Sequence, residues 1–251
     1  MAVVFENEIL RALPWNERMS LEPLLESEYL AQGQILIQPS SPLQSAWFPE
    51  DAVLSRVMDA GSRSPEVGMI GREGFVGTAL LTDTLAFPAT TRVLIPGRTW
   101  RIRADDFRLS LSLHAGLAKL CRCFAHALYI QTASIAVTNA TAPLEQRLAR
   151  WLLMVDDRVG GKDITVSHEQ IASLLGVRRP SVTVGLQILE GHGLLRATRK
   201  SIRIRDRQRL QAVAGELYGL AECEWERLMT LAHRPGTVVR ESFKAAAFRA
   251  E

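Results

Sequence analysis

The chain has 251 residues, of which 47% are hydrophobic and 23% charged, a composition typical of globular domains and unlike that of fibrous or low-complexity chains. Its three cysteines are too few for a disulfide framework, and the first is Cys121. The N-terminus lacks the basic and then apolar pattern of a signal peptide, and the most apolar stretch, Leu117 to Val137, is interrupted by charged residues. We therefore expect a cytoplasmic protein without a membrane-spanning segment.

The net charge of +3 is unevenly distributed along the chain. The stretch from Arg178 to Arg209 holds nine basic residues and two acidic ones, so the rest of the chain is mildly acidic. A basic segment on a mildly acidic body is typical of nucleic-acid-binding proteins. A solvated basic tail would have the same composition and is the alternative.

The N-terminal half divides into a helical lead and a β-rich domain. Apolar residues at helical spacing predict short helices over residues 1–27. Over residues 28–104, short runs rich in Val, Ile, Phe and Trp alternate with Gly, Pro and Ser at intervals of about 8–12 residues. This pattern predicts a β-roll, and therefore an α+β fold for the whole chain.

Residues 105–139 are predicted to form a long helix, because there is one glycine and no proline between Ala115 and Asn139. About 23 helical residues extend about 35 Å and carry more apolar surface than one small roll covers. We therefore expect this helix to join two copies of the chain, with packing on its own roll as the alternative. The expected interface residues are Leu117, Leu120, Phe124, Leu128 and Ile135.

Residues 140–218 show the pattern of a winged helix-turn-helix domain. Thr141 and Pro143 are expected to cap and start a helix that ends at Gly160. Ser167 is expected to cap a short helix that ends at Gly176, and Pro180 is expected to open a second short helix. Two short helices joined by a glycine turn form a helix-turn-helix, and the basic segment that follows alternates like a β-hairpin wing.

The second short helix is expected to read DNA, because its apolar positions Val182, Leu186 and Leu189 share one face. Side chains on the opposite face and on the wing are then free to contact a duplex. Cations and hydroxyls hold phosphates, whereas bidentate or apolar side chains contact base edges. The expected phosphate contacts are Arg178, Ser181, Arg199, Lys200 and Arg203, and the expected base-reading residues are Arg179, Thr183, Val184 and Gln187. Pro180 lies on the same DNA-facing side of the helix.

These features together resemble the Crp/Fnr superfamily of bacterial transcription regulators. The resemblance is carried by Gln32–Leu36, Trp47–Glu50, Gly68–Gly77, Leu144–Leu153 and the helix-turn-helix, and it covers the chain to about Tyr218. It implies a cyclic-nucleotide-binding-like β-roll, a dimerisation helix and a winged helix. We therefore expect a homodimer on a near-palindromic duplex DNA site, with a roll that senses a small molecule or has lost sensing. A further hypothesis, which can hold together with the first, is a protein-interaction module whose roll and C-terminal extension recruit a partner such as RNA polymerase. The extension over residues 219–251 lies outside the resemblance. The effector-pocket candidates are Glu73, Gly74, Gly77, Thr90, Thr91 and Arg92.

The chain also departs from the family pattern. Members that bind cyclic AMP hold its phosphate with an Arg followed by Ser or Thr, whereas Phe87-Pro88 or Ala89-Thr90 stands there in this chain. We therefore expect no cyclic AMP. No cysteine precedes Cys121 to hold an N-terminal iron–sulfur cluster. The family's DNA-reading residues are represented by Arg179 alone, so we expect a different operator.

A nucleotide-binding enzyme or signalling module that uses the Gly71–Gly77 loop is the competing interpretation. That loop lacks the Gly-Lys-Ser/Thr ending of a phosphate-binding loop and does not open a long helix. Cys121 and Cys123 point to different sides of a helix, so no metal site is expected there. We therefore expect a regulator without enzymatic activity, cofactor or metal, and the sequence does not identify its effector or its direction of control.

Overall fold

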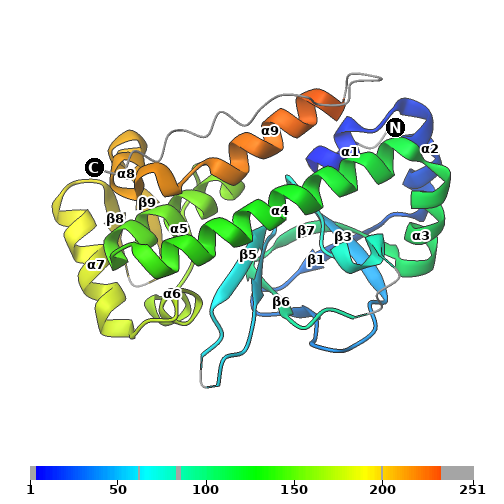
Figure 1. Cartoon of the computed structure of the whole chain (residues 1–251). Helices are drawn as coiled ribbons and strands as arrows, with labels where there is room; N and C mark the ends of the chain where they lie inside the picture. The colour runs from blue at the N-terminus through cyan, green and yellow to red at the C-terminus, as the bar shows by residue number, and fades with distance from the viewer. Residues whose placement is uncertain (1–3, 62, 83–85, 199, 233–251) are drawn as a thin grey trace.

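The computed structural model describes residues 4–61, 63–82, 86–198 and 200–232. It contains an N-terminal β-roll and a C-terminal helical domain, which are arranged along one long helix (Figure 1). Short helices precede the roll: α1 (Glu8–Ala12), α2 (Trp15–Leu21) and the 3-10 helix η1 (Glu22–Leu24). Asn7 caps α1 by accepting hydrogen bonds from the amides of Ile9 and Leu10, as expected for asparagine at this position.

The roll consists of two antiparallel sheets, with strand orders β1-β7-β3 and β2-β6-β4-β5. Turn residues separate its short strands, as the alternating composition predicts, and the 3-10 helix η2 (Thr78–Leu81) follows β5. Four phenylalanine rings, from Phe48, Phe75, Phe107 and Phe124, pack in its core with centroids 5.5–5.8 Å apart. The strands are β1 (Glu26–Leu30), β2 (Ile35–Ile37), β3 (Ser45–Pro49), β4 (Val53–Val57), β5 (Glu66–Ile70), β6 (Thr90–Ile95) and β7 (Gly97–Arg103).

The long helical region is two helices rather than one. α3 (Ala104–Leu113) ends where His114 adopts an extended backbone, and α4 (Ala115–Thr141) follows. The apolar side of α4 was expected to pack against a second copy of the chain, and the structure differs from this expectation. All five expected interface residues are 0–9% exposed within the single chain. The apolar side of α4 therefore covers its own roll, which was the alternative interpretation, and Leu117, Leu120, Phe124, Leu128 and Ile135 are not available to a partner.

Among the described helices, α4 alone is long and apolar enough to cross a membrane by length and composition. This finding differs from the expectation that polar residues make it too polar. Lys119, Arg122 and His126 lie on its exposed side, so they leave its buried side apolar. Core helices of soluble proteins pass the same test, and α4 packs against β5, η2 and another helix.

The C-terminal domain begins with α5 (Leu144–Val159), which Gly160 ends in a left-handed conformation. Thr141 is the last residue of α4 rather than a cap, and Pro143 precedes the first turn of α5. The domain continues through α6 (His168–Leu175), α7 (Arg179–Gly191), β8 (Leu195–Ala197), β9 (Ile202–Ile204), α8 (Arg207–Ala214) and the 3-10 helix η3 (Gly215–Leu217). Its core is formed by α5, α6 and α7 together with residues of the roll.

The C-terminal extension contributes a further helix, α9 (Leu220–Ala232), that packs along α4 and reaches back to the roll (Figure 1). The indole of Trp225 meets the ring of Phe124 edge-on at 5.9 Å and donates a hydrogen bond to Glu8 in α1 at 2.8 Å. Glu224 lies 3.4 Å from His126 in α4. This extension therefore joins the N-terminal helices to the middle of the long helix.

Candidate nucleic-acid interface

The helix-turn-helix is built from local signals at the ends of α6 and α7. Ser167 and Gln170 form a capping box at the start of α6, and Gly176 ends that helix with φ at 66°. A side chain at Gly176 would be strained at this positive φ. The second helix begins at Arg179, one residue before the proline that was expected to open it, and Arg178 is its N-cap.

The two faces of α7 have opposite surroundings. Val182, Leu186 and Leu189 are at most 1% exposed and pack into the core of the domain. On the other face, Pro180 and Gln187 are exposed, and the side chain of Val184 is 54% exposed although it is apolar. Because an exposed apolar side chain can contact a thymine methyl group, this face has the chemistry of a DNA-reading surface.

Cations surround the exposed face of α7. Arg178 and Arg179 are exposed at its start, and Lys200 is exposed between the wing strands. Two further wing arginines, Arg196 and Arg205, are also exposed, although they were not among the expected contacts. The alternation that predicts the wing already places Arg205 outward, since Ile204 before it turns inward. Within the described parts of the chain, none of these five cations forms an ion pair. Arg199 lies outside the described residues.

Three expected contacts are placed differently from the prediction. Thr183 is half-buried, and its hydroxyl lies 3.0 Å from Nδ1 of His168 and donates to the carbonyl of Arg179 at 3.2 Å. Arg203 forms an ion pair with Asp163, so its guanidinium is already engaged. Ser181 is half-buried in the first turn of α7. The side chains of Thr183 and Arg203 therefore already have partners within the domain, and a duplex would compete for them.

Two arginines that sequence reasoning missed hold the turn between α6 and α7. Arg147 of α5 donates to the carbonyl of Leu175. Arg63 lies in the connection between β4 and β5 and donates to the carbonyl of Gly176 at 3.1 Å. Carbonyls at a helix C-terminus lack partners within the helix, so these arginines satisfy them. The roll and the turn of the helix-turn-helix are therefore in direct contact.

The expected effector-pocket residues do not meet in one place. Glu73 faces the C-terminal domain, where its carboxylate pairs with Arg158 at 2.7 Å. Gly74 lies beneath Phe124 so closely that a Cβ would come within 2.0 Å of the ring, and a Cβ at Gly77 would lie 3.2 Å from Ala46. Thr90, Thr91 and Arg92 lie on β6 instead. The Gly71–Gly77 loop is therefore a packed turn, and the phosphate-loop interpretation is not favoured.

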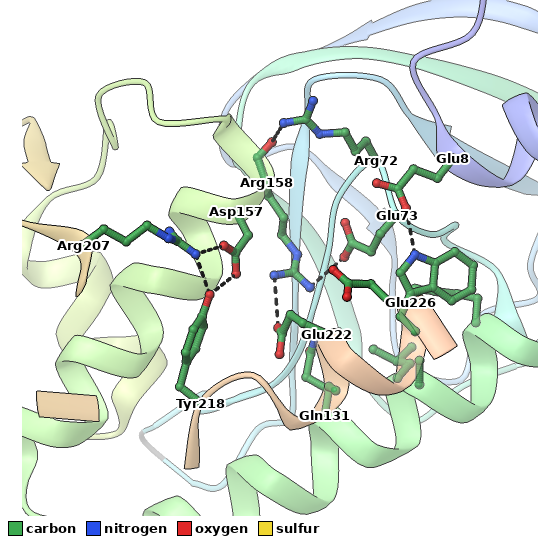
Figure 2. A pocket seen from close by; sticks show the side chains of 15 residues that line it. Glu8, Arg72, Glu73, Gln131, Asp157, Arg158, Arg207, Tyr218, Glu222 and Glu226 are labelled. Atoms are coloured by element: carbon green, nitrogen blue, oxygen red, sulfur yellow. Dashed lines mark hydrogen bonds and ion pairs between the residues drawn. The ribbon is translucent and has the colours of Figure 1, made fainter. Parts of the chain in front are cut away.

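The roll and the C-terminal domain enclose a pocket of about 340 Å³ that the sequence did not predict. Figure 2 shows the side chain of Arg158 at its centre, between Glu73 and Glu222. Beside it, Arg207 pairs with Asp157, and both contact the hydroxyl of Tyr218. Phe124, Leu128 and Trp225 give the pocket an apolar wall. The ion pair between Arg158 and Glu73 joins the C-terminal domain to the roll, whereas the contacts among Arg207, Asp157 and Tyr218 lie within the C-terminal domain.

A second polar contact between the domains is buried in the core. Glu66 of β5 accepts hydrogen bonds from the indole of Trp151 at 3.0 Å and from the hydroxyl of Ser55. Burial raises the pKa of Glu66 to about 7, although both hydrogen bonds favour its ionised form. The contact between the roll and the C-terminal domain therefore contains a carboxyl group whose pKa is close to neutral pH.

Within the residues that the structure describes, no three His, Cys, Asp or Glu side chains are grouped as metal ligands. Cys121 is buried and Cys123 is half-buried on another side of α4, so the two thiols do not share a site.

The fold and the exposed face of α7 define the class of this protein: it is a winged helix-turn-helix protein with an N-terminal β-roll. More specifically, residues 146–213 match the family model of the Crp-like helix-turn-helix domain. The chain therefore carries a Crp-like helix-turn-helix domain. A search of curated proteins finds no match.

Solved structures similar to the whole fold come from Crp/Fnr regulators. The chain matches a protein described as a transcriptional regulator of the Crp/Fnr family from Eubacterium rectale with a TM-score of 0.63 at 17% identity, over 82% of this chain and 97% of that chain. It matches FixK2 from Bradyrhizobium japonicum with a TM-score of 0.64 at 16% identity, over 76% and 98% of the two chains. The c-di-GMP-responsive global regulator CLP from Xanthomonas campestris matches with a TM-score of 0.62 at 18% identity, over 76% and 99%. The chain has the fold of these regulators.

Proposed function

We propose that this protein is a sequence-specific DNA-binding transcription regulator. The observation that carries the proposal is the exposed face of α7, which presents Arg179, Val184 and Gln187 beside a wing whose arginines project into solvent. An α-helix of this kind fits the major groove, where arginine reads guanine and glutamine reads adenine. The basic residues around it supply the contacts to phosphates that hold a reading helix in register.

The protein acts as a homodimer in this proposal, through a different face of α4 from the one that the sequence indicated. Tyr129, Ala133, Ala136 and Ala140 form an exposed stripe at helical spacing along the second half of α4. Small side chains allow two helices to approach closely, and Tyr129 adds apolar area that is 69% exposed in the single chain. Two copies joined here would place two α7 helices on a near-palindromic site, with half-sites one helical turn apart.

Effector control, a cytoplasmic location and contact with RNA polymerase belong to the same proposal. The roll covers one side of α4, so a molecule that changed its packing would change the arrangement of the paired helices. We expect neither cyclic AMP nor an iron–sulfur cluster as the effector. A catalytic activity has no place in this proposal.

The proposal is tested by selecting bound duplexes from random DNA with the full-length protein, followed by gel shifts on the selected site. We expect an inverted repeat and an affinity that falls steeply as salt rises, since each neutralised phosphate releases counterions. The variant R11A serves as a control, because Arg11 is exposed on α1 far from the wing. If the protein shows no preference among duplexes and no retention at low salt, it is not a DNA-reading regulator.

A further inference from the structure

Arg56 is a cation buried inside the roll. It lies on β4 opposite Thr91 of β6, and the side chains of both point inward with Leu54 and Val93, which belong to the core of the roll. Arg56 is 7% exposed and Thr91 is fully buried. On its other side, Arg56 is paired with Gly68 of β5, which lacks a side chain that could fill the space. A Cβ at Gly68 would lie 3.3 Å from Leu128 of α4, so the site is next to the long helix.

The hydrogen-bonding groups at this site are incompletely used. The guanidinium donates one hydrogen bond, from Nη2 to the hydroxyl of Thr78 at 3.3 Å, and it lies 4.5 Å from the ring centroid of Phe87. Nε of Arg56 and the hydroxyl of Thr91 are buried without a hydrogen-bond partner in the structure as described. Among the described residues, no carboxylate forms an ion pair with Arg56.

This arrangement is unfavourable for the protein alone. Burial lowers the pKa of Arg56 to about 10, so the side chain remains positively charged at neutral pH. A buried charge is costly unless an opposite charge and hydrogen bonds compensate for it. Arg158, a buried arginine of the contact between the domains, has such compensation from Glu73 and Glu222. Arg56 has an aromatic ring and one hydroxyl, which compensate for its charge only in part.

We propose that the inside of the roll binds a small oxyanion, a carboxylate or an inorganic phosphate, between the guanidinium of Arg56 and the hydroxyls of Thr91 and Thr78. A planar guanidinium matches either anion with two parallel hydrogen bonds, and the hydroxyl of Thr91 gains the partner that it lacks. The ring of Phe87 is half-buried beside the exposed Pro88, so this side of the site is near the surface and gives an anion its way in. This inference rests on the proposed function only where it makes the anion the effector of the regulator.

This site differs from the one that the sequence indicated. Thr91 is common to both, but Glu73 pairs with Arg158 of the C-terminal domain and Gly74 lies beneath Phe124. Arg92 points to the opposite face of β6, because it pairs with Ser55 rather than with Arg56. The essential cation comes from strand β4, and no sequence pattern marks it.

The experiment measures anion binding to the full-length protein by titration calorimetry and by thermal melting, with sodium phosphate, sodium acetate and cyclic AMP added separately to a buffer of large organic ions. We expect a saturable rise in Tm with phosphate or with acetate, because an anion bound only to the folded state stabilises it by mass action. A rise in Tm with phosphate but not acetate indicates a phosphate ligand, and a rise with acetate but not phosphate indicates a carboxylate ligand. No saturable effect of either anion, or an effect of cyclic AMP alone, overturns the inference.

Three variants make the test specific to this site. R56M is expected to bind the anion at least tenfold more weakly and to have a higher Tm than the wild type in the anion-free buffer, because it removes an uncompensated charge. T91V is expected to weaken binding, and R92M is expected to bind as the wild type does. Equal binding by R56M and the wild type, or loss of binding in R92M alone, would contradict the proposal.

The two proposals fail separately in this design. Gel shifts with the wild type, run with and without the anion, report whether the protein binds DNA in either state. DNA binding without anion binding refutes the inference and leaves the regulator in place. Anion binding without DNA binding refutes the proposed function and leaves the site in place.

Discussion

Glu66 shows how one buried carboxyl can make stability depend on pH. Its pKa in the folded protein is raised from the ordinary 4.5 to about 7, so the folded state binds a proton more tightly than the unfolded chain. Stability associated with this group is fully present below pH 4.5 and is lost as pH rises through 7. The shift corresponds to a loss of about 3 kcal/mol across that window.

We predict that E66Q is less sensitive to pH than the wild type between pH 5 and 8, because glutamine cannot ionise. Urea unfolding at a series of pH values measures the difference, which should be largest at pH 8, where E66Q is the more stable protein. E169Q is the matched control, since Glu169 is exposed on α6. Parallel pH profiles for E66Q and the wild type would show that Glu66 is ionised in the folded state at all these pH values.

The reading residues and the wing residues should have different effects on DNA binding. We predict that R179A and Q187A each lower discrimination at one base pair of the site, by about 1–3 kcal/mol, because these side chains face base edges. R196A and K200A should weaken all duplexes alike and reduce the salt dependence, because phosphates carry no sequence information. Gel shifts on the selected site and on single-mismatch sites measure both effects, and equal losses of discrimination in the two pairs would disprove this assignment.

At the scale of residues, sequence reasoning placed the apolar positions better than the polar ones. Val182, Leu186 and Leu189 are buried as predicted, because helical spacing alone decides which side of α7 is apolar. The partners of Thr183 and Arg203 lie elsewhere in the chain, at His168 and Asp163. Local sequence could not reveal that these side chains are occupied. The burial of Arg56 could not be predicted from local sequence either, since it follows from the pairing of β4 with β5 and β6.

The helix α9 is the element about which the sequence gave the least information, yet it has extensive contacts with α4. Trp225 is 6% exposed, packs on Phe124 and donates to Glu8, so it connects three helices. We predict that W225A destabilises the protein by about 3–5 kcal/mol, as expected for deleting a large buried side chain. Urea unfolding measures this loss. L220A serves as the control because Leu220 is 53% exposed, and similar small losses in both variants would mean that α9 contributes little to stability.

Elements with a strong local pattern were predicted from the sequence nearly to the residue. The Ser167 cap of α6, the left-handed Gly176 and the wing hairpin are all local features, and each is present. The boundary between α3 and α4 was missed because His114 breaks the helix without a proline or glycine. Periodicity also identified the apolar side of α4 correctly but could not say whether a roll or a second chain covers it.

At the scale of the whole molecule, subunit pairing depends on the exposed stripe of α4. We predict that A136R is monomeric, because a long charged side chain at the centre of the stripe prevents close approach of two helices. Its affinity for the inverted repeat should fall by at least tenfold, while its affinity for a single half-site stays unchanged. Sedimentation equilibrium and gel shifts on the two duplexes measure this. R122A, on the exposed side of α4 nearer its start, should remain dimeric. A dimeric A136R would place the subunit interface elsewhere.

The fold of the whole chain was predictable because its β-rich, helical and basic segments follow one another without a repeat or a long linker. The interdomain pocket was not, since its walls come from α1, the Gly71–Gly77 loop, α4, α5, α8 and α9. Residues that meet from so many segments have no common sequence pattern. The same applies to Arg63, whose contact with Gly176 joins segments far apart along the chain.

The hydrogen bond from Arg63 to the carbonyl of Gly176 links the roll to the reading helix within a single subunit. Strand β4 contains Arg56, which lies inside the roll. The connection after β4 contains Arg63, which donates a hydrogen bond to the turn before α7. A movement of this strand pair would therefore reorient α7 without any rearrangement between two subunits. A variant that stays single in solution would then retain its allosteric response at an isolated half-site, and cooperativity and sensing would be separable properties of this protein.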